Sequence, residues 1–425
     1  MTAAIAAART GAKVAVAERM VRVGKKLLAS GNGRCNLSNV NIDENFYHGA
    51  DVKSAFSILK KNGDNFAVDF FRSLGVLVRL EDQSRYYPAT FSSNTVLDAL
   101  RSEAARLGVA EMCSYEAVSV IKTSRVFTTC FKDKPDYISD RIIIAAGGMS
   151  SPHLGSNGSG YKLFTDMGHS LITPAPMLTQ IHLDAGGIRG LKGIRVHAGL
   201  SLISKKCEKT IFKDKGELLF TDHGLSGIPA FNLSCRLAPQ ISAALQSGVY
   251  KTAPVMRCDG YTVSIDLFPE YTHKEMYEFL IFQVKNKPDI PVRDILCGIM
   301  NNRVAAHITT RFFDEIEKET QNSGKTAKKI PPGDLRLSDK NIAYLTSVLK
   351  DLRHRIIGTS GFENAQVTYG GLSIDDFYPD TLESKIVKGL YAAGEILDIA
   401  GDCGGYNLHW AWASGYTAGG AAAQR

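Results

Sequence analysis

The chain has 425 residues, which is too long for one small domain and fits two or three domains of ordinary size. Hydrophobic residues make up 44% and charged residues 22%, as in globular proteins, and this balance excludes a chain that is disordered throughout. The 50 Lys and Arg exceed the 43 Asp and Glu by a net charge of +7. Spread over this length, the excess is too weak to indicate a nucleic-acid partner.

The eight cysteines include no Cys-x-x-Cys pair and no cluster with the spacing of zinc ligands. We therefore expect reduced thiols, no metal site and a cytoplasmic location. No apolar run approaches the ~18–20 residues of a membrane span, so we expect no membrane partner. We expect that the alanine-rich start is not a signal peptide, because Arg9 and Lys13 interrupt it and no basic residue precedes it.

The first eighteen residues predict a helix followed by a strand. Residues 1–10 are rich in alanine and predict the helix, and Gly11 ends it. Residues 13–18 predict a short buried strand that finishes in Glu18. This order is typical of the second half of a βαβ dinucleotide-binding unit, where the terminal acid accepts hydrogen bonds from a ribose 2′-OH. An ordinary αβ hairpin with an exposed Glu is the alternative interpretation.

Residues 24–39 predict a loop, because three glycines alternate there with serine and asparagine. Backbone N–H groups in such a loop can point at one ligand. Lys25, Lys26 and Arg34 add positive charge. The loop follows directly after Glu18, so we expect it to lie along the pyrophosphate and ribityl chain of a dinucleotide. The alternative is a solvated surface turn.

The middle of the chain begins with an αβ pattern. A buried strand at 141–148 ends in Gly147 and Gly148, and small residues there let the chain pass close to a bound cofactor. Short alternating segments over 172–265 predict a mostly β domain. The other expected elements are helix and strand at 66–80, a helix at 93–107, a hairpin over 117–121 and 126–131, helices at 273–320 and 338–357, and an exposed polar loop at 318–334.

The last sixty residues predict a second ligand-binding segment. Residues 390–398 indicate a strand that ends in glycine and acid, 401–407 a tight turn, and 407–422 a helix of small residues. A glycine turn that opens a helix presents free N–H groups and the positive end of the helix dipole. A flavin ring that gains negative charge on reduction would be stabilised there.

Five stretches together resemble the BaiN/YhiN-type bacterial flavoproteins, a family of NAD(P)/FAD-dependent oxidoreductases that is also described as aminoacetone-oxidase-like. They are GKKLLASGNGRCNLSN, IIIAAGGMSSPHLGSNGSGY, GELLFTDHGLSGIPAF, VTYGG and GLYAAGEILDIAGDCGGYNLHWAWASGYTAG. The stretches run in the family's order from residue 3 to the end, so the resemblance covers nearly the whole chain.

The resemblance implies an α/β fold with a Rossmann-type FAD-binding domain assembled from both chain ends, an inserted β-rich domain and a helical subdomain. The first part of the FAD-binding domain is expected at residues 1–165 and the second part at 366–425. The β-rich substrate domain is expected at 166–270 plus part of 330–365, and the helical subdomain at 271–330.

The resemblance also implies cofactor-binding residues. Glu18 resembles the ribose acid, and Gly147 with Gly148 resembles the crossing near the adenosine. The remaining residues are Gly24, Lys25, Gly33, Arg34, Cys35 and Asn36 around pyrophosphate and flavin, Gly394, Glu395 and Asp398 at the ribityl chain, and Gly405, Tyr406, Asn407 and Leu408 at the helix start under the ring.

The chain departs from the family at its start. The family opens with a strand and a glycine-rich turn, and counting back from Glu18 puts that turn at or before residue 1. We hypothesise that Met1 is an internal methionine of a longer reading frame, which the upstream DNA tests. Without that segment the pyrophosphate lacks its helix N-terminus and the sheet lacks its central strand, so we expect poor folding or weak FAD retention.

The expected chemistry is hydride transfer through the flavin N5. No second Gly-x-Gly-x-x-Gly follows a strand, so NAD(P)H is expected only as a transient co-substrate. The expected substrate is a small unsaturated molecule, of steroid-like type. Two alternatives stay open: an amine or aminoketone oxidase that uses O2, and a non-catalytic or FAD-deficient truncated relative. The oligomeric state stays open as well.

His223 and His409 are candidates for proton transfer, with Arg34 as an electrostatic partner. Each has an alternative, because His409 also fits a packed helix residue and His223 an exposed turn residue. Cys35 is a redox candidate if Arg34 and a nearby dipole lower the pKa of its thiol. Otherwise it is a small buried neighbour of the flavin.

Overall fold

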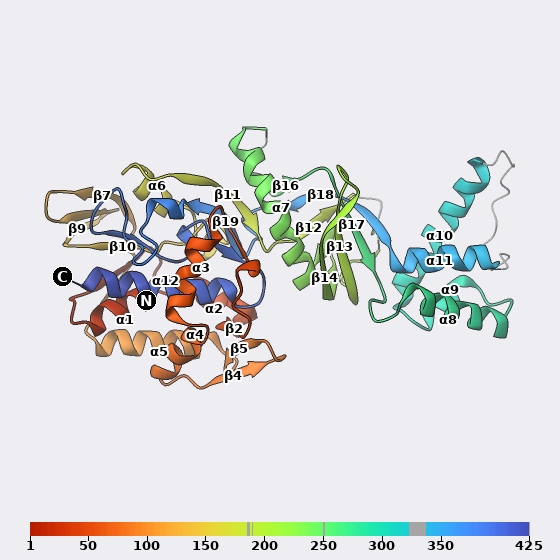
Figure 1. Cartoon of the computed structure of the whole chain (residues 1–425), viewed down its shortest axis with the longest axis horizontal. Coiled ribbons are helices and arrows are strands. Elements are labelled where there is room, and N and C mark those ends of the chain that lie inside the picture. Colours follow the sequence, from red (N-terminus) through yellow and green to blue (C-terminus); the bar gives the residue numbers. More distant parts are fainter. Residues whose placement is uncertain (185–187, 189, 250, 323–336, 425) are drawn as a thin grey trace. The chain divides into compact units, whose positions relative to one another are not determined.

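The computed structural model describes residues 1–184, 188, 190–249, 251–322 and 337–424. The chain divides into two compact units. The terminal unit consists of residues 1–178, 237–254 and 360–425, and the inserted unit of residues 179–236 and 255–359. The terminal unit therefore contains both chain ends, coloured red and blue in Figure 1.

In the terminal unit the first and last helices pack against each other (Figure 1). α1 (Thr2–Arg9) forms because alanine, the strongest helix former, fills it. α12 (Tyr406–Ala423) approaches it so closely that Gly419 faces the backbone of Ala3. The other helices of this unit are α2 (Lys25–Ala29), α3 (Val52–Asn62), α4 (Phe66–Ser73), α5 (Ser93–Arg106) and α6 (Ser159–Thr165), with the end of α7 (Ile228–Gln246).

Two parallel ladders form the αβ part of this unit. β1 (Ala15–Glu18) pairs with β6 (Ala110–Cys113), and β10 (Ile142–Ile144) pairs with β20 (Leu390–Ala392). The second ladder joins segments that lie about 250 residues apart in the sequence. The C-terminal part of the chain therefore supplies one strand of this ladder and completes the terminal unit. Within the described residues, no strand links the two ladders.

The remaining strands of the terminal unit form small antiparallel sheets. They are β2 (Ser38–Asn39), β5 (Arg85–Pro88) and β4 (Val78–Glu81); β3 (Tyr47–His48) with β21 (Ala400–Gly401); β7 (Ala117–Lys122), β8 (Phe127–Phe131) and β9 (Lys134–Ser139); and β11 (Leu171–Met177) with β19 (Val367–Leu372).

The inserted unit contains one sheet that closes on itself, because β12 pairs with both β15 and β18. Its strands alternate between a buried and an exposed face, as in β18, where Leu352 and Ile356 are buried and Arg353 and Arg355 are exposed. In spatial order the strands are β12 (Ile181–Leu183), β15 (Gly224–Ser226), β14 (Lys209–Phe220), β13 (Arg195–Ser204), β17 (Tyr261–Asp266), β18 (Leu352–Ser360) and β16 (Val255–Arg257).

Helices α8 (His273–Asn286), α9 (Val292–Cys297), α10 (Asn302–Asn322) and α11 (Asp339–Lys350) also belong to the inserted unit. α8 starts at a capping box, in which Thr272 and Glu275 satisfy each other's backbone N–H groups. The rings of Phe312 and Tyr344 stack at 5.8 Å and join α10 to α11.

Three predicted elements differ from the structure. The helix expected at 338–357 ends at Lys350, and β18 follows, because the alternation from Leu352 onward has the period of a strand. The loop expected at 24–39 contains α2, since Lys25–Ala29 are good helix formers. Of the loop expected at 318–334, the first residues continue α10 to Asn322, and the rest lies outside the described residues.

All eight cysteines lie in described parts of the chain, and none of them forms a disulfide bond. In those same parts, no helix combines the length and the apolar character needed to cross a lipid bilayer.

Candidate functional site

The predicted helix start under the flavin is a tight junction between two chain segments. Gly405 is the N-cap of α12 in the left-handed region, with φ of 99°. A Cβ at Gly405 would come within 2.7 Å of Asn36 Oδ1 and of the Ser38 carbonyl oxygen, so only glycine fits. Asn407 closes the turn, since its amide both accepts from Gly401 N and donates to Gly401 O at 2.7 Å. The loop after Gly33 therefore abuts the start of α12.

His409 lies at this junction and is fully buried. Its Nδ1 is 2.8 Å from Ser38 Oγ. Burial lowers the pKa of the imidazole to about 4, so the ring is neutral at physiological pH. A role of His409 in proton transfer stays a prediction.

A second cluster brings three distant segments together at Glu395. Its Oε2 is paired with Lys26 Nζ at 2.7 Å, and its Oε1 accepts from Thr368 N at 2.9 Å. A Cβ at Gly148 would lie 3.1 Å from Glu395 Oε1. Gly394 is fixed by Ser414 Oγ, which accepts from its N–H at 3.0 Å. The predicted pyrophosphate, adenosine and ribityl segments thus meet around one carboxylate.

Asp398 is a buried carboxyl close to this cluster. It is 1% exposed, and its Oδ2 accepts from Ala50 N at 2.7 Å. Burial raises the pKa of Asp398 to about 7, against the opposing effect of its backbone hydrogen bonds. Burial, together with Glu395 and Asp398, also raises the pKa of the Tyr161 hydroxyl.

Several buried polar atoms around these clusters have no hydrogen-bond partner within the described residues: Asn36 Oδ1, Ser156 Oγ, Tyr161 OH, Asp398 Oδ1 and His409 Nε2. Each such atom costs about 1–3 kcal/mol if it stays unsatisfied. Two of the five are predicted cofactor ligands, and Ser156 faces Gly147. A ligand with many hydroxyl and phosphate groups fits this set, as FAD does.

The other predicted residues of the first segment are placed as follows. Glu18 ends β1, and its Oε1 accepts from Met20 N at 2.8 Å. Gly24 is the N-cap of α2 in the left-handed region, Lys25 is the first residue of that helix, and Gly33 has φ of 82°. The contacts of these residues with a cofactor stay predictions.

Arg34 has partners of its own in the structure. It pairs with Glu81 at 2.9 Å, and its guanidinium lies 4.6 Å from the ring centroid of Tyr87 and 4.5 Å from that of Phe91. Stacking of this kind orients a guanidinium. Arg34 is therefore positioned by an aromatic pair that the motif alone does not reveal.

The idea of a low thiol pKa at Cys35 is wrong. The side chain is fully buried, and burial raises its pKa to about 12 in spite of a hydrogen bond with Ser30. Arg34 is committed to Glu81, so it does not offset this effect.

Cys35 should therefore resist alkylation in the folded chain. At pH 8 a thiol of pKa about 12 is ionised in only about one molecule in ten thousand. The exposed Cys207 is the internal control. With iodoacetamide followed by peptide mass spectrometry, Cys207 should be labelled while Cys35 stays unmodified; equal labelling of both in the folded protein would contradict the burial.

The site also contains a pair that the motifs missed. His48 Nε2 lies 2.7 Å from Asp402 Oδ1, and the two side chains are 12% and 6% exposed. The β3–β21 ladder aligns His48 with Ala400, two residues before Asp402. The sequence gives no signal for this pair, because a ladder of two residues on each strand has no recognisable periodicity and because His48 and Asp402 are 354 positions apart.

His223 belongs to the inserted unit. It is an exposed residue just before β15, and its ring stacks on that of His182 with centroids 6.0 Å apart. Its carbonyl oxygen accepts from Leu183 N at 2.8 Å. Its role in proton transfer stays a prediction.

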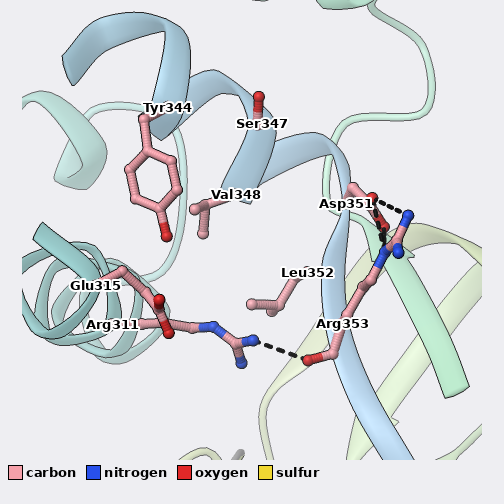
Figure 2. A pocket seen from close by; sticks show the side chains of 8 residues that line it. All are labelled: Arg311, Glu315, Tyr344, Ser347, Val348, Asp351, Leu352 and Arg353. Carbon is pink, nitrogen blue, oxygen red and sulfur yellow. Dashed lines mark hydrogen bonds and ion pairs between the residues drawn. The ribbon is translucent and has the colours of Figure 1, made fainter. Parts of the chain in front are cut away.

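Two cavities have linings that include none of the predicted residues. One of about 410 Å³ in the terminal unit is lined by Met149, Thr173, Pro174, Leu245, Lys251, Thr252 and Phe362. The other, of about 220 Å³, lies in the inserted unit between α10, α11 and the start of β18. Figure 2 shows Arg311 reaching the carbonyl oxygen of Arg353 across it, with Tyr344 and Val348 on α11.

The family model described as the HI0933-like protein Rossmann domain matches residues 1–421. The chain belongs to this family. The 3-dehydro-bile acid delta(4,6)-reductase of Clostridium scindens is 34% identical, over 100% of this chain and 97% of the relative. The ribosomal RNA dihydrouridine synthase of Escherichia coli is 27% identical, over 96% of this chain and 92% of the relative.

Among solved structures, the chain is similar to a 3-ketosteroid-delta4-(5alpha)-dehydrogenase from Rhodococcus jostii RHA1, with a TM-score of 0.42 and 12% identity over 100% of this chain and 94% of the other. It is also similar to a flavocytochrome c3 fumarate reductase, with a TM-score of 0.41 and 15% identity over 99% and 76%. At these scores the likeness supports no statement about function.

The family match confirms the resemblance that the five sequence stretches indicate, together with the α/β, Rossmann-type fold class. The relatives confirm the class of enzyme, an oxidoreductase of the flavoprotein type. A flavin is the cofactor of that class, and the unpartnered polar atoms of the terminal unit fit one. The nicotinamide donor and the substrate belong to the proposal that follows.

Proposed function

We propose that this HI0933-like protein reduces a carbon–carbon double bond conjugated to a carbonyl group, with FAD as cofactor and NAD(P)H as the electron donor. The observation that carries this proposal is the 34% identity, over the whole chain, with the bile acid reductase. The names of both curated relatives describe saturation of a double bond next to a carbonyl, in a 3-keto steroid or in uracil. The substrate we favour is a small steroid-like enone.

The cofactor would be held by residues of the terminal unit. Glu18, at the end of β1, would bind a ribose of the cofactor, while Asn36, Tyr161 and Asp398 would offer buried polar atoms to the cofactor's hydroxyl and amide groups. The start of α12 offers backbone N–H groups at Gly405. When bound, FAD supplies the hydride that the substrate receives.

A uridine in RNA is the second candidate substrate, and the charge distribution favours it. The inserted unit carries 25 Lys and Arg and 19 Asp and Glu, so it holds +6 of the chain's net charge of +7. The hairpin of β13 and β14 exposes Lys205, Lys206, Lys209, Lys213 and Lys215. A phosphate backbone would be attracted to such a surface.

Anaerobic half-reactions test the proposal. The purified chain, loaded with FAD, should be bleached by NADH or NADPH in stopped-flow absorbance. The reduced protein should then be reoxidised by a 3-keto-4-ene steroid, with a product two mass units heavier. The matched control is the saturated 3-ketosteroid, which has no double bond to reduce and should leave the flavin reduced.

Two other results would change the assignment. Reoxidation by a uridine-containing RNA, but not by the enone, would select the second candidate. Bleaching by amines rather than by nicotinamides, with peroxide formed from O2, would contradict both candidates and support an oxidase.

A further inference from the structure

The larger cavity of the terminal unit has a lining that does not suit the cofactor. Its volume of about 410 Å³ lies within the usual range of small-molecule sites. The lining includes none of the buried polar atoms that lack a partner, whereas FAD has many hydroxyl and phosphate groups to offer to such atoms. Most of its wall is apolar and consists of half-buried side chains, those of Met149, Pro174, Leu245 and Phe362.

Hydrogen bonds between separate chain segments hold the walls of this cavity together. Ser242 Oγ donates to Thr173 O at 2.6 Å, which joins α7 to β11. Ser151 N donates to Phe362 O at 2.9 Å, so the segment that begins at Met149 is tied to the segment of Phe362. The cavity is therefore bounded by segments with defined partners.

One wall of the cavity adjoins the cluster around Glu395. Met149 N donates to Thr368 Oγ1 at 2.8 Å, and Thr368 N donates to Glu395 Oε1 at 2.9 Å. A single residue, Thr368, thus connects the cavity wall to the carboxylate around which the predicted cofactor segments meet. A molecule in the cavity would lie against the chain segment that leads to this cluster.

Lys251 gives the apolar cavity a positive charge. Among the described residues that line it, Lys251 alone is charged, and its ammonium group has no hydrogen-bond or ion-pair partner in the described parts of the chain. Pro254 O accepts from Gly361 N at 2.8 Å, and a Cβ at Gly361 would lie 2.4 Å from Ala253 O. This close approach fixes the segment that carries Lys251.

We propose that the cavity is a binding site for a small apolar acid, whose carboxylate pairs with Lys251 while its hydrocarbon body covers the apolar wall. Covering that wall removes apolar surface from water, which favours binding. One lysine matches one negative charge, so a monocarboxylate fits better than a pyrophosphate. Thr173 and Thr252 add hydroxyl donors to the same lining. This inference goes beyond the proposed function and does not depend on it.

Titration calorimetry on the FAD-loaded full-length chain tests the charge. The probes are decanoate and 1-decanol, which share one hydrocarbon chain and differ in charge, and the wild type should bind decanoate more tightly. Lys251→Met keeps a long side chain without the charge. It should weaken decanoate binding about two- to fivefold, as for an exposed ion pair, and leave 1-decanol binding unchanged. Lys132→Met, at an exposed lysine outside the lining, is the matched control and should change neither affinity.

A second variant tests the cavity itself. Thr252 is exposed, so Thr252→Trp should fill the cavity without disturbing the fold and abolish binding of both probes, whereas Thr252→Ser should retain it. Unchanged binding in Thr252→Trp would overturn the site, because the probes would then bind elsewhere. Equal decanoate affinities of the wild type and Lys251→Met would overturn the choice of an acid. A failure to reduce enones would count against the proposed function alone, since neither probe is an enone.

Discussion

Replacing Gly419 by alanine should lower the free energy of unfolding by about 1–3 kcal/mol, whereas the same change at the next residue, Gly420, should leave it unchanged or raise it. A Cβ at Gly419 would meet the carbonyl oxygen of Ala3 at 2.2 Å and the Ala3 Cα at 2.8 Å. These are backbone atoms of α1 and cannot rotate away. A Cβ at Gly420 meets nothing within 4 Å, and alanine is favoured over glycine in a helix by about 1 kcal/mol.

Urea unfolding measures the difference. Trp410 and Trp412 lie on the same helix as the two glycines, so their fluorescence reports the loss of α12 packing, and circular dichroism gives the global transition. The two variants differ by one methyl group at neighbouring positions, which makes each the control of the other. Equal midpoints would show that α1 and α12 are not packed as closely as the structure has them.

Asp398→Asn should act in opposite directions on stability and on flavin retention. In the native state the pKa of Asp398 is raised to about 7, above the ~3.9 of an unfolded chain. Below pH 4 both states hold the proton. Between about pH 4 and 7 only the native state holds it, so stability falls as pH rises, and above pH 7 the full cost of the buried charge remains.

The amide has no charge to bury, so the variant should be more stable than the wild type at pH 8 by up to about 4 kcal/mol, and the stability difference between the two should grow from pH 4 to 7. If Asp398 accepts hydrogen bonds from the ribityl chain, the same variant should lose FAD more readily on dialysis. Asp376→Asn is the control, because Asp376 also accepts one backbone N–H, from Ser170 at 2.6 Å, but lies at a partly exposed site.

Unfolding at several pH values and the absorbance of retained flavin check the two effects separately. A variant with the wild-type pH profile would contradict the buried, ionisable state of Asp398. A stabilised variant that retains as much flavin as the wild type would support the raised pKa of Asp398 and contradict a contact between Asp398 and the cofactor.

Much of the fold follows from local patterns in the sequence. Alanine content predicts α1, and the apolar run that ends in Glu18 predicts β1, because these signals lie within a few residues of one another. The end of the helix at Lys350 could not be predicted in this way, because the strand that follows it depends on residues far away in the sequence. β18 is defined by its neighbours β17 and β12 in the closed sheet, and its alternating residues directly follow a genuine helix.

The site was predictable only where it consists of glycines with a defined purpose. Position 405 requires a glycine because Asn36 and Ser38 lie too close to leave room for a Cβ atom. This requirement is visible in the sequence itself, since the residue there is a glycine. The pairs of Lys26 with Glu395 and His48 with Asp402 depend on side chains that are more than 350 positions apart. Ionisable side chains are common along any chain, so no local feature of the sequence distinguishes these four residues from the others of their type.

The assembly of the terminal unit from both chain ends has a consequence during synthesis. Ile5 on α1 is fully buried, in a cluster that includes Trp412 of α12. The ribosome makes roughly 5–20 residues per second, so α1 exists for tens of seconds before its partner helix emerges. Throughout that interval the whole inserted unit can fold, while the first helix exposes its apolar face to water or to a chaperone.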